Sequence, residues 1–268
     1  MENEKTIHDF ESELICEYFS KLDRQGPGSP EMTLKALSFI DSLARPSAAA
    51  RPSTTEHTYK IADIGCGTGG QTMLLGQNTA GTITGIDIFQ DFIDIFNDNA
   101  KNLKLQDRVK GIAGSMDALP FQNGEFDLIW CEGAIYNIGF ERGLNEWRNY
   151  LKKDGFIAVT EASWFTNERP SEIEDYWMHH YSGITTIANN VAAMQKSGFI
   201  PVSVFTLPEN CWIDNYFVLQ IPLYDFFLKK YGGNKTVEEF VAGNRREEQM
   251  YHEYKKYYGY VFYIGKKI

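Results

Sequence analysis

Cysteine pairs and long apolar runs are both missing from this 268-residue sequence. The four cysteines, Cys16, Cys66, Cys131 and Cys211, are far apart and form no Cys-x-x-Cys motif, so neither a disulfide framework nor a thiolate zinc site is indicated. No window approaches the roughly 18 consecutive apolar residues of a membrane span. The N-terminus is polar and acidic, whereas a signal peptide needs a basic start and an apolar run. The sequence therefore predicts a cytoplasmic protein with reduced thiols and no membrane span.

Positive charge is also in short supply. The chain has 26 Lys and Arg residues against 36 Asp and Glu residues, which gives a formal net charge of −10. Such a surface should repel a phosphate backbone, which a nucleic-acid-binding protein must neutralise with clustered basic residues. We therefore expect no nucleic-acid partner. The adjacent His179 and His180 would diverge on a helix and make a poor pair of metal ligands, so we expect no metal site either.

The first part of the chain is predicted to be helical. Residues 9–23 place Phe10, Leu14, Tyr18 and Leu22 at a spacing of four on one face, and the glycine- and proline-rich segment 24–30 ends that helix. A second helix is predicted at 30–43. Residues 44–58 are small and polar, as is typical of a linker. Residues 1–58 are therefore predicted to be an N-terminal helical cap and linker.

From residue 59 onward, short apolar runs alternate with amphipathic helices. Strands are predicted at 59–64, 82–87, 109–113, 126–131 and 156–160, and helices at 71–78, 91–105 and 141–151. Strands that are apolar on both faces and alternate with helices indicate a parallel sheet covered on each side. The predicted fold class is α/β, with a Rossmann-like doubly wound sheet.

Beyond residue 160 the alternation loosens. Helices are predicted at 187–197, 216–231 and 237–257, and strands at 200–207 and 258–264. Segments at about 162–186 and 208–257 are rich in aromatic residues and are predicted to be insertions that cover the substrate. Residues 59–268 would then form the core, and the length of the chain favours one structural domain overall.

The most informative segment is Ile61-Ala-Asp-Ile-Gly-Cys-Gly-Thr-Gly-Gly70, in which a buried strand runs into a glycine cluster that opens a helix. Glycines suit such a turn because other residues adopt its dihedral angles at a cost and because a ligand must approach the backbone closely. Gly65, Gly67 and Gly70 fit the pattern of dinucleotide-binding enzymes. Gly65, Gly67 and Gly69 fit that of methyltransferases, so the loop alone leaves both classes open.

Two acidic residues lie beside this loop. Asp87 ends the second predicted strand, where it could accept both hydroxyls of an adenosine ribose in either class. Asp63 precedes the first glycine by two residues. Its charge would repel a pyrophosphate but not an amino-acid ammonium, which favours a methyltransferase over a nicotinamide-dependent enzyme.

Five motifs follow one another between about residues 59 and 161: Ala-Asp-Ile-Gly-Cys-Gly-Thr-Gly, Gly-Ile-Asp, Leu-Pro-Phe, Phe-Asp-Leu-Ile-Trp and Leu-Lys-Lys-Asp-Gly. In this order and spacing the sequence resembles the class I S-adenosylmethionine-dependent methyltransferases, in particular the small-molecule group related to the ubiquinone/menaquinone biosynthesis methyltransferases. The resemblance implies a seven-stranded sheet, mostly parallel with an antiparallel C-terminal strand. It also implies S-adenosylmethionine as the cofactor.

The resemblance assigns cofactor roles residue by residue. Backbone groups of the glycine loop would approach the methionine part, with Asp63 near its ammonium, while Asp87 would hold the ribose. The family commonly has Asp where this chain has Ser115, so either Ser115 or Asp117 would accept a hydrogen bond from the adenine amino group. The expected cofactor-binding residues are Asp63, Gly65, Cys66, Gly67, Gly69, Asp87, Ile88, Ser115, Met116, Asp117 and Glu132.

Candidate catalytic residues follow the fourth predicted strand, because ligands of such sheets lie beyond the carboxyl ends of the strands. Glu132 could touch the methionine end or act as a general base, and Tyr136 could line the methyl site; capping or packing would explain both equally simply. Aromatic residues could roof the acceptor pocket or form the core beneath the cap. The candidates for the pocket are Tyr18, Tyr136, Trp164, Trp177, Tyr181 and Trp212.

The sequence therefore predicts methyl transfer from S-adenosylmethionine to an O, N or C atom of a small molecule. One alternative is a module that binds S-adenosylmethionine or S-adenosylhomocysteine without catalysis. A nicotinamide-dependent oxidoreductase is another, since it would share the glycine loop and Asp87. The acceptor, the oligomeric state and closure of the cap are left open by the sequence.

Overall fold

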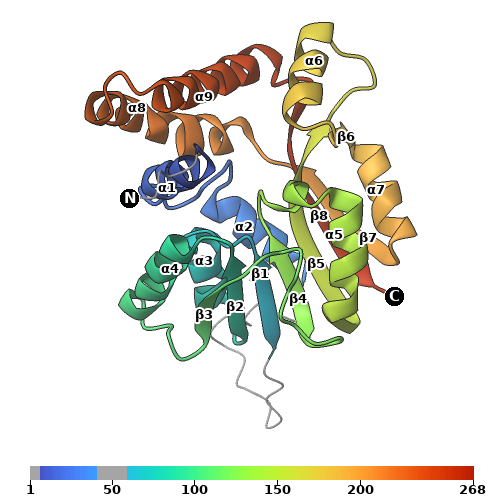
Figure 1. Ribbon diagram of the computed structural model, residues 1–268. Helices are drawn as coiled ribbons and strands as arrows, with labels where there is room; N and C mark the ends of the chain where they lie inside the picture. The colour runs from blue at the N-terminus through green and yellow to red at the C-terminus, as the bar shows by residue number, and fades with distance from the viewer. Residues whose placement is uncertain (1–6, 41–58) are drawn as a thin grey trace.

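The computed structural model describes residues 7–40 and 59–268, and the predicted linker at 44–58 lies outside this part of the chain. Its centre is an eight-stranded sheet of order β3-β2-β1-β4-β5-β8-β7, with the short β6 paired to β5 (Figure 1). The strands are β1 (Lys60–Ile64), β2 (Thr82–Asp87), β3 (Val109–Ala113), β4 (Phe126–Cys131), β5 (Leu151–Trp164), β6 (Thr185–Thr186), β7 (Phe199–Thr206) and β8 (Tyr258–Lys267).

Helices cover both faces of this sheet, as the apolar strands predict. One face packs against α2, α3 and α4, through residues such as Leu37, Leu75 and Phe96. The other packs against α5 and α7, through residues such as Trp147 and Met194. The helices are α1 (Ile7–Phe19), α2 (Pro30–Ser38), α3 (Gly70–Asn78), α4 (Gln90–Asn102), α5 (Phe140–Trp147), α6 (Ser171–His180), α7 (Ile187–Lys196), α8 (Val218–Lys230) and α9 (Lys235–Tyr254).

The predicted fold class is confirmed. Strands β1 to β5 are mutually parallel, so their carboxyl ends meet at one edge of the sheet. The C-terminal strand β8 inserts between β5 and β7 and runs antiparallel to both. Seven strands form the continuous path of the sheet, and the two-residue β6 is an addition that the sequence did not indicate.

Strand β5 is longer than predicted, because it spans Leu151–Trp164 instead of 156–160. The helix predicted at 141–151 correspondingly ends at Trp147, and a 3₁₀ turn at Arg148–Tyr150 leads into the strand. The polar residues of Leu-Lys-Lys-Asp-Gly resemble a turn in sequence. They are held as strand because Leu151 pairs with Phe126 of β4, an interaction that a local pattern does not contain.

A helical cap lies over the carboxyl edge of the sheet, where α1, α8 and α9 pack together (Figure 1). Their shared cluster contains Leu14 and Tyr18 of α1, Phe227 of α8 and Val241 of α9. The ring of Tyr18 is fully buried, and its hydroxyl donates to Gln220 Oε1 at 3.0 Å. Tyr18 therefore belongs to the core of the cap and does not face an acceptor pocket.

The three tryptophans expected over the acceptor lie in the core as well. Trp164, Trp177 and Trp212 are only 4%, 8% and 1% exposed and belong to the main hydrophobic cluster. Trp212 stacks on Tyr251 of α9 with ring centroids 4.5 Å apart. Trp164 and Trp177 both pack against Tyr258 of β8. These positions correct the prediction of a common pocket wall, because all three rings are enclosed by the core.

The core position of Trp212 makes a prediction about stability. Trp212→Ala should lower the free energy of unfolding by about 3–5 kcal/mol, because it leaves a large cavity beneath α9. Leu219→Ala is the control, since Leu219 is 48% exposed on α8, and it should change this free energy by about 0.5 kcal/mol or less. Urea denaturation of both variants measures the difference. Near-normal stability of Trp212→Ala, together with lost acceptor binding, would return Trp212 to the pocket.

Candidate active site

A cavity of about 540 Å³ opens at the carboxyl edge of the sheet, between the ends of β1, β2 and β4 and the cap. Its volume lies in the usual range for small-molecule and cofactor sites. Loops after four parallel strands and the segment between α1 and α2 contribute to the wall. The lining includes Arg24, Gln25, Gly65, Gly67, Gln71, Asp87, Ile88, Ser115, Met116, Asp117, Glu132, Tyr136 and Tyr216.

The glycine loop is held by the end of β2. The backbone N–H groups of Gly65 and Cys66 both donate to Ile86 O, at 2.8 and 3.1 Å. Gly65 has φ +72°, and a Cβ there would overlap that of Ala134 in the loop after β4. Gly67 has φ +54°, and a Cβ there would overlap the Gln25 side chain. Both positions therefore require glycine, for conformation and for space.

Asp87 joins this loop to the end of β2. Its Oδ2 accepts from Gly67 N at 2.9 Å and its Oδ1 accepts from Phe89 N at 3.1 Å. Burial raises the pKa of the carboxyl, and the hydrogen bonds from Phe89 and Gly67 oppose that shift. Each oxygen keeps a further lone pair for a ligand hydroxyl. The next residue, Ile88, is 67% exposed and lines the cavity as an apolar surface.

Asp63 lies behind the loop and is not among the residues that line the cavity, so its predicted contact with a ligand ammonium would be indirect. Its Oδ2 accepts from Thr72 Oγ1 at 2.5 Å and from Gln71 Nε2 at 3.2 Å. The other oxygen has no hydrogen-bond partner among the described residues. Burial raises the pKa of Asp63 to about 7. Asp63 therefore acts on the cavity through Gln71, which does line it.

Two more residues of the loop support it from behind. The Cys66 side chain is fully buried, and the backbone N–H expected to face a ligand is engaged by Ile86 O. Gly69 has φ +90° at the start of α3, and a Cβ there would meet Phe96 at 2.6 Å. The structure thus places Cys66 and Gly69 in the support of the loop, outside the residues that line the cavity.

The loop after β3 also contributes to the wall of the cavity. Ser115, Met116 and Asp117 all line the cavity. Ser115 Oγ accepts from Asp117 N at 3.2 Å. The Asp117 carboxylate forms an ion pair with Arg142 at 2.8 Å, on a side chain that is 56% exposed. The carboxylate of Asp117 is therefore engaged by Arg142. Of the two residues, Ser115 is the better candidate to accept a hydrogen bond from an adenine amino group.

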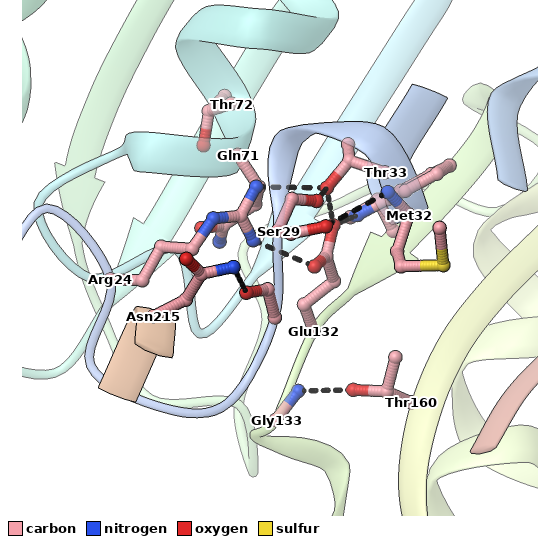
Figure 2. Close-up of polar contacts among 12 residues, drawn as sticks. Arg24, Ser29, Met32, Thr33, Gln71, Thr72, Glu132, Gly133, Thr160 and Asn215 are labelled. Carbon is pink, nitrogen blue, oxygen red and sulfur yellow. Dashed lines mark hydrogen bonds and ion pairs between the residues drawn. The ribbon is translucent and has the colours of Figure 1, made fainter. Parts of the chain in front are cut away.

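Glu132 is held in a network of three donors, shown in Figure 2. Arg24 Nη1 donates to Oε2 at 2.8 Å, while Thr33 Oγ1 and Trp130 Nε1 donate to Oε1 at 2.7 and 2.9 Å. Arg24 also donates to Thr33 Oγ1 at 2.8 Å. Such a carboxylate is well suited to fix the N-terminal segment over the cavity and poorly placed to accept a proton.

Sequence reasoning offered the turn at 24–29 as part of a pocket roof but gave no role to Arg24 or Gln25 themselves. Gln25 Nε2 donates to Leu22 O at 2.8 Å and to Thr68 Oγ1 at 3.0 Å, so the side chain bridges the cap and the glycine loop. Asn215 Nδ2 donates to Gly28 O at 3.1 Å and fastens the same segment to the cap (Figure 2). Polar residues inside a glycine- and proline-rich turn are the one sequence signal that pointed here.

Tyr136 alone among the predicted pocket aromatics lines the cavity. Its side chain is 42% exposed, which leaves the ring accessible from the cavity. Tyr181 packs against it edge to face, with ring centroids 5.7 Å apart. Tyr216 comes from the cap and also lines the cavity. The end of the cavity opposite Ile88 is therefore lined by tyrosine.

The described residues contain neither a candidate metal centre nor a candidate membrane span. Within 7–40 and 59–268, no group of three or more His, Cys, Asp or Glu side chains is placed to hold a metal ion. In the same part of the chain, no helix is long and apolar enough to cross a bilayer.

The fold and the cavity together define the class. A parallel sheet of order 3-2-1-4-5, completed by an antiparallel final strand, carries a glycine loop, an acid at the end of β2 and a closed cap over one cavity. This arrangement is that of a Rossmann-like methyltransferase fold, in which ligands bind beyond the carboxyl ends of the strands.

Comparisons with known proteins agree with this class. Residues 61–155 match the methyltransferase domain family. Methyltransferase GfsG of Streptomyces halstedii is 26% identical over 126 residues, which cover 43% of this chain and 45% of GfsG. A ubiquinone/menaquinone biosynthesis C-methyltransferase of Citrifermentans bemidjiense is 24% identical over 153 residues, which cover 56% of this chain and 64% of that enzyme. Residues 61–155 thus form a methyltransferase domain similar to those of these enzymes, as the motifs indicate.

A solved structure extends the similarity of fold to nearly the whole chain. The S-adenosylmethionine-dependent methyltransferase from Geobacter sulfurreducens, in complex with S-adenosylhomocysteine, superposes with a TM-score of 0.78 at 17% sequence identity. The superposition covers 96% of this chain and 98% of that one. The cap helices therefore share in the similarity, whereas the match to GfsG spans less than half of that relative.

The position of Gln25 against Gly67 predicts how much stability is lost when a Cβ is added at Gly67. Gly67→Ala and Gly124→Ala both place a Cβ at positive φ, +54° and +66°, but nothing lies within 4 Å of the second site. Both should lose about 1–2 kcal/mol of stability from backbone strain. Gly67→Ala should lose about 1 kcal/mol more, because Gln25 must give up hydrogen bonds. Chemical denaturation compares them. Equal losses would show that Gln25 moves away freely.

The buried Asp63 makes a prediction about pH. Its pKa lies above the ordinary value of 3.8, so its neutral form stabilises the folded protein below about pH 4, and this contribution is lost as the pH rises through about 7. Asp63→Asn removes the loss. The free energy of unfolding of Asp63→Asn relative to the parent protein should therefore rise between pH 4 and pH 8, as measured by urea denaturation. A difference that stays constant over this range would contradict the assignment.

Proposed function

We propose that the protein transfers a methyl group from S-adenosylmethionine to a small-molecule acceptor. The observation that carries this proposal is the joint position of Asp87 and the glycine loop at one end of the cavity. Asp87 offers acceptors for two ribose hydroxyls, and Gly65 and Gly67 line the same cavity beside it. The related methyltransferases support the same chemistry.

The residues around the cavity fit the parts of this cofactor. Asp87 would hold the ribose, Ile88 would pack on the adenine, and Ser115 and Met116 would meet the adenine edge. The methionine end would lie beside Gly65 and Gly67. Arg24 lines the cavity there and offers a cation for the methionine carboxylate, while Gln71 offers polar atoms for the ammonium.

The cofactor would supply a methyl group on a sulfonium, which is already an activated leaving group. The protein then has to align the acceptor and exclude water. The contacts of Glu132 with Arg24 and Thr33 close the N-terminal segment over the cavity. We therefore assign Glu132 a positioning role in place of a general base. Tyr136 would line the methyl site.

The acceptor is a small molecule in this proposal, because the cavity lies beneath the cap helices and its volume of about 540 Å³ is of ligand size. An acidic protein of net charge −10 is not suited to nucleic acid. All four cysteines are free and buried. Reduced thiols fit an enzyme that works in the cytoplasm.

The assignment of Asp87 is tested by calorimetry. Asp87→Ala should weaken binding of S-adenosylhomocysteine by about 1.5–3 kcal/mol, because an ionised acceptor of the ribose is lost. Asp91→Ala, on the first turn of α4, is the control and should bind as tightly as the parent protein. Circular dichroism confirms that each variant is folded. Unchanged affinity of a folded Asp87→Ala variant would refute the assignment of the ribose.

Turnover separates an enzyme from a binding module. The parent protein should release S-adenosylhomocysteine from S-adenosylmethionine when small acceptors are supplied, as measured by a coupled assay. Tight binding of both ligands without release in the presence of any acceptor would favour the module instead.

A further inference from the structure

A second buried carboxyl lies at the carboxyl end of β5, outside the residues assigned to the cofactor. Glu161 is only 2% exposed. Among the described residues, neither of its carboxylate oxygens has a partner in hydrogen-bonding geometry, although the Tyr181 hydroxyl and the Ala162 N–H lie nearby, and no cation forms an ion pair with it. An uncompensated carboxylate at such a depth is costly to maintain unless a ligand or a proton neutralises it.

The surroundings of Glu161 connect it to the cavity. Its carboxylate acts on Tyr181 and Tyr136, whose rings pack edge to face at 5.7 Å, and Tyr136 lines the cavity. It acts also on Tyr260, whose hydroxyl lies 3.9 Å from the position of a Cβ on Gly133 in the cavity wall. Glu161 thus stands behind the tyrosines that form this end of the cavity.

A second carboxylate reaches the same tyrosines from above. Glu247 is half-buried on α9. Burial is the main cause of the raised pKa of Tyr136, Tyr216 and Tyr260, and the charge of Glu247 is a further cause for each. Burial raises the pKa of Glu247 itself to about 7. Two carboxyls, from β5 and α9, therefore give this end of the cavity a negative potential whenever they are ionised, and no described basic residue forms an ion pair with either.

Burial raises the pKa of Glu161 to about 8, and the Tyr181 hydroxyl and the Ala162 N–H oppose the shift. The ionisable groups that interact with Glu161 come from three segments: Cys131 and Tyr136 of β4 and the turn after it, Tyr181 after α6, and Tyr260 and Tyr263 of β8. None of these groups is a cation at neutral pH. The side chain is therefore protonated in the empty site and ionises when a positive charge arrives.

The chemistry of this end selects one class of ligand. Tyrosine ring faces attract cations, and two carboxylates strengthen that attraction. An anion would be repelled from the same place, and a neutral alcohol would gain only hydrogen bonds. Building on the proposed function, we propose that the methyl acceptor is a small cationic amine, bound against Tyr136 with its positive charge toward Glu161.

The reaction balances with the groups at hand. The bound ammonium gives one proton to the Glu161 carboxylate, which leaves a neutral amine with a free lone pair. The nitrogen lone pair then forms the N–C bond while the C–S bond breaks and its electrons remain on sulfur. The products are a methylated ammonium and the neutral thioether S-adenosylhomocysteine.

Three probes of matched shape test the charge preference: benzylammonium, benzyl alcohol and benzoate, each titrated calorimetrically into the protein saturated with S-adenosylhomocysteine. Benzylammonium should bind at least tenfold more tightly than benzyl alcohol, and benzoate should bind most weakly. Benzyl alcohol binding as tightly as benzylammonium would overturn the proposal. So would tighter binding of benzoate, or no binding of any probe.

Two variants assign the preference to the carboxyls. Glu161→Gln should reduce the preference for benzylammonium over benzyl alcohol at least tenfold and leave affinity for S-adenosylhomocysteine unchanged. Glu141→Gln is the matched control, because Glu141 is exposed on α5 and pairs with Lys196. Glu247→Gln gives a second arm with a smaller reduction, should Glu161→Gln fail to fold. A preference that survives in a folded Glu161→Gln variant, or in Glu247→Gln if that one alone folds, would overturn the proposal.

Proton release adds a readout independent of affinity. Binding of benzylammonium at pH 7 should release close to one proton, seen as a dependence of the binding heat on the buffer, and Glu161→Gln should abolish it. Absence of proton release in the parent protein would contradict the role of Glu161. The proposed function fails separately, if S-adenosylhomocysteine does not bind; the three probes titrated without it then still decide the charge preference.

Discussion

The hydrogen bonds between the end of β2 and the glycine loop are the constraint on which the cavity depends. Ile86 O accepts from two successive N–H groups of the loop, and the Asp87 carboxylate accepts from a third at Gly67. These bonds fix the loop in conformations that only glycine adopts easily. They also leave Asp87 facing the cavity, so one short segment both shapes the site and supplies its acid.

Three carboxylates near the cavity have different hydrogen-bond partners and therefore different roles. Asp63 orders the loop from behind through Thr72 and Gln71. Glu132, fully hydrogen-bonded, holds Arg24 and closes the N-terminal segment. Glu161 has no such partner among the described residues, and this contrast distinguishes a carboxyl that maintains structure from one that is available to a ligand.

Local patterns were enough for the centre of the fold. Strands β2, β3 and β4 begin and end where their apolar runs do, because each run carries buried apolar residues and is bounded by turns. The length of β5 was not predictable in this way, since Leu151 is strand only through its pairing with Phe126. Sequence likewise could not tell a buried Trp212 from a pocket residue, because both roles favour an aromatic side chain.

For the candidate site, too, only the residues that lie close together in sequence were predictable. Gly65, Gly67 and Asp87 were predictable because the loop and the strand end carry them together in sequence. The pair of Arg24 and Glu132 spans 108 residues and was invisible without the fold. A crystal structure with S-adenosylhomocysteine tests the central claim most directly. We predict that the ribose hydroxyls of this ligand lie within hydrogen-bond distance of Asp87 and that its sulfur faces Tyr136. A ligand bound elsewhere, with Asp87 free of it, would contradict the account.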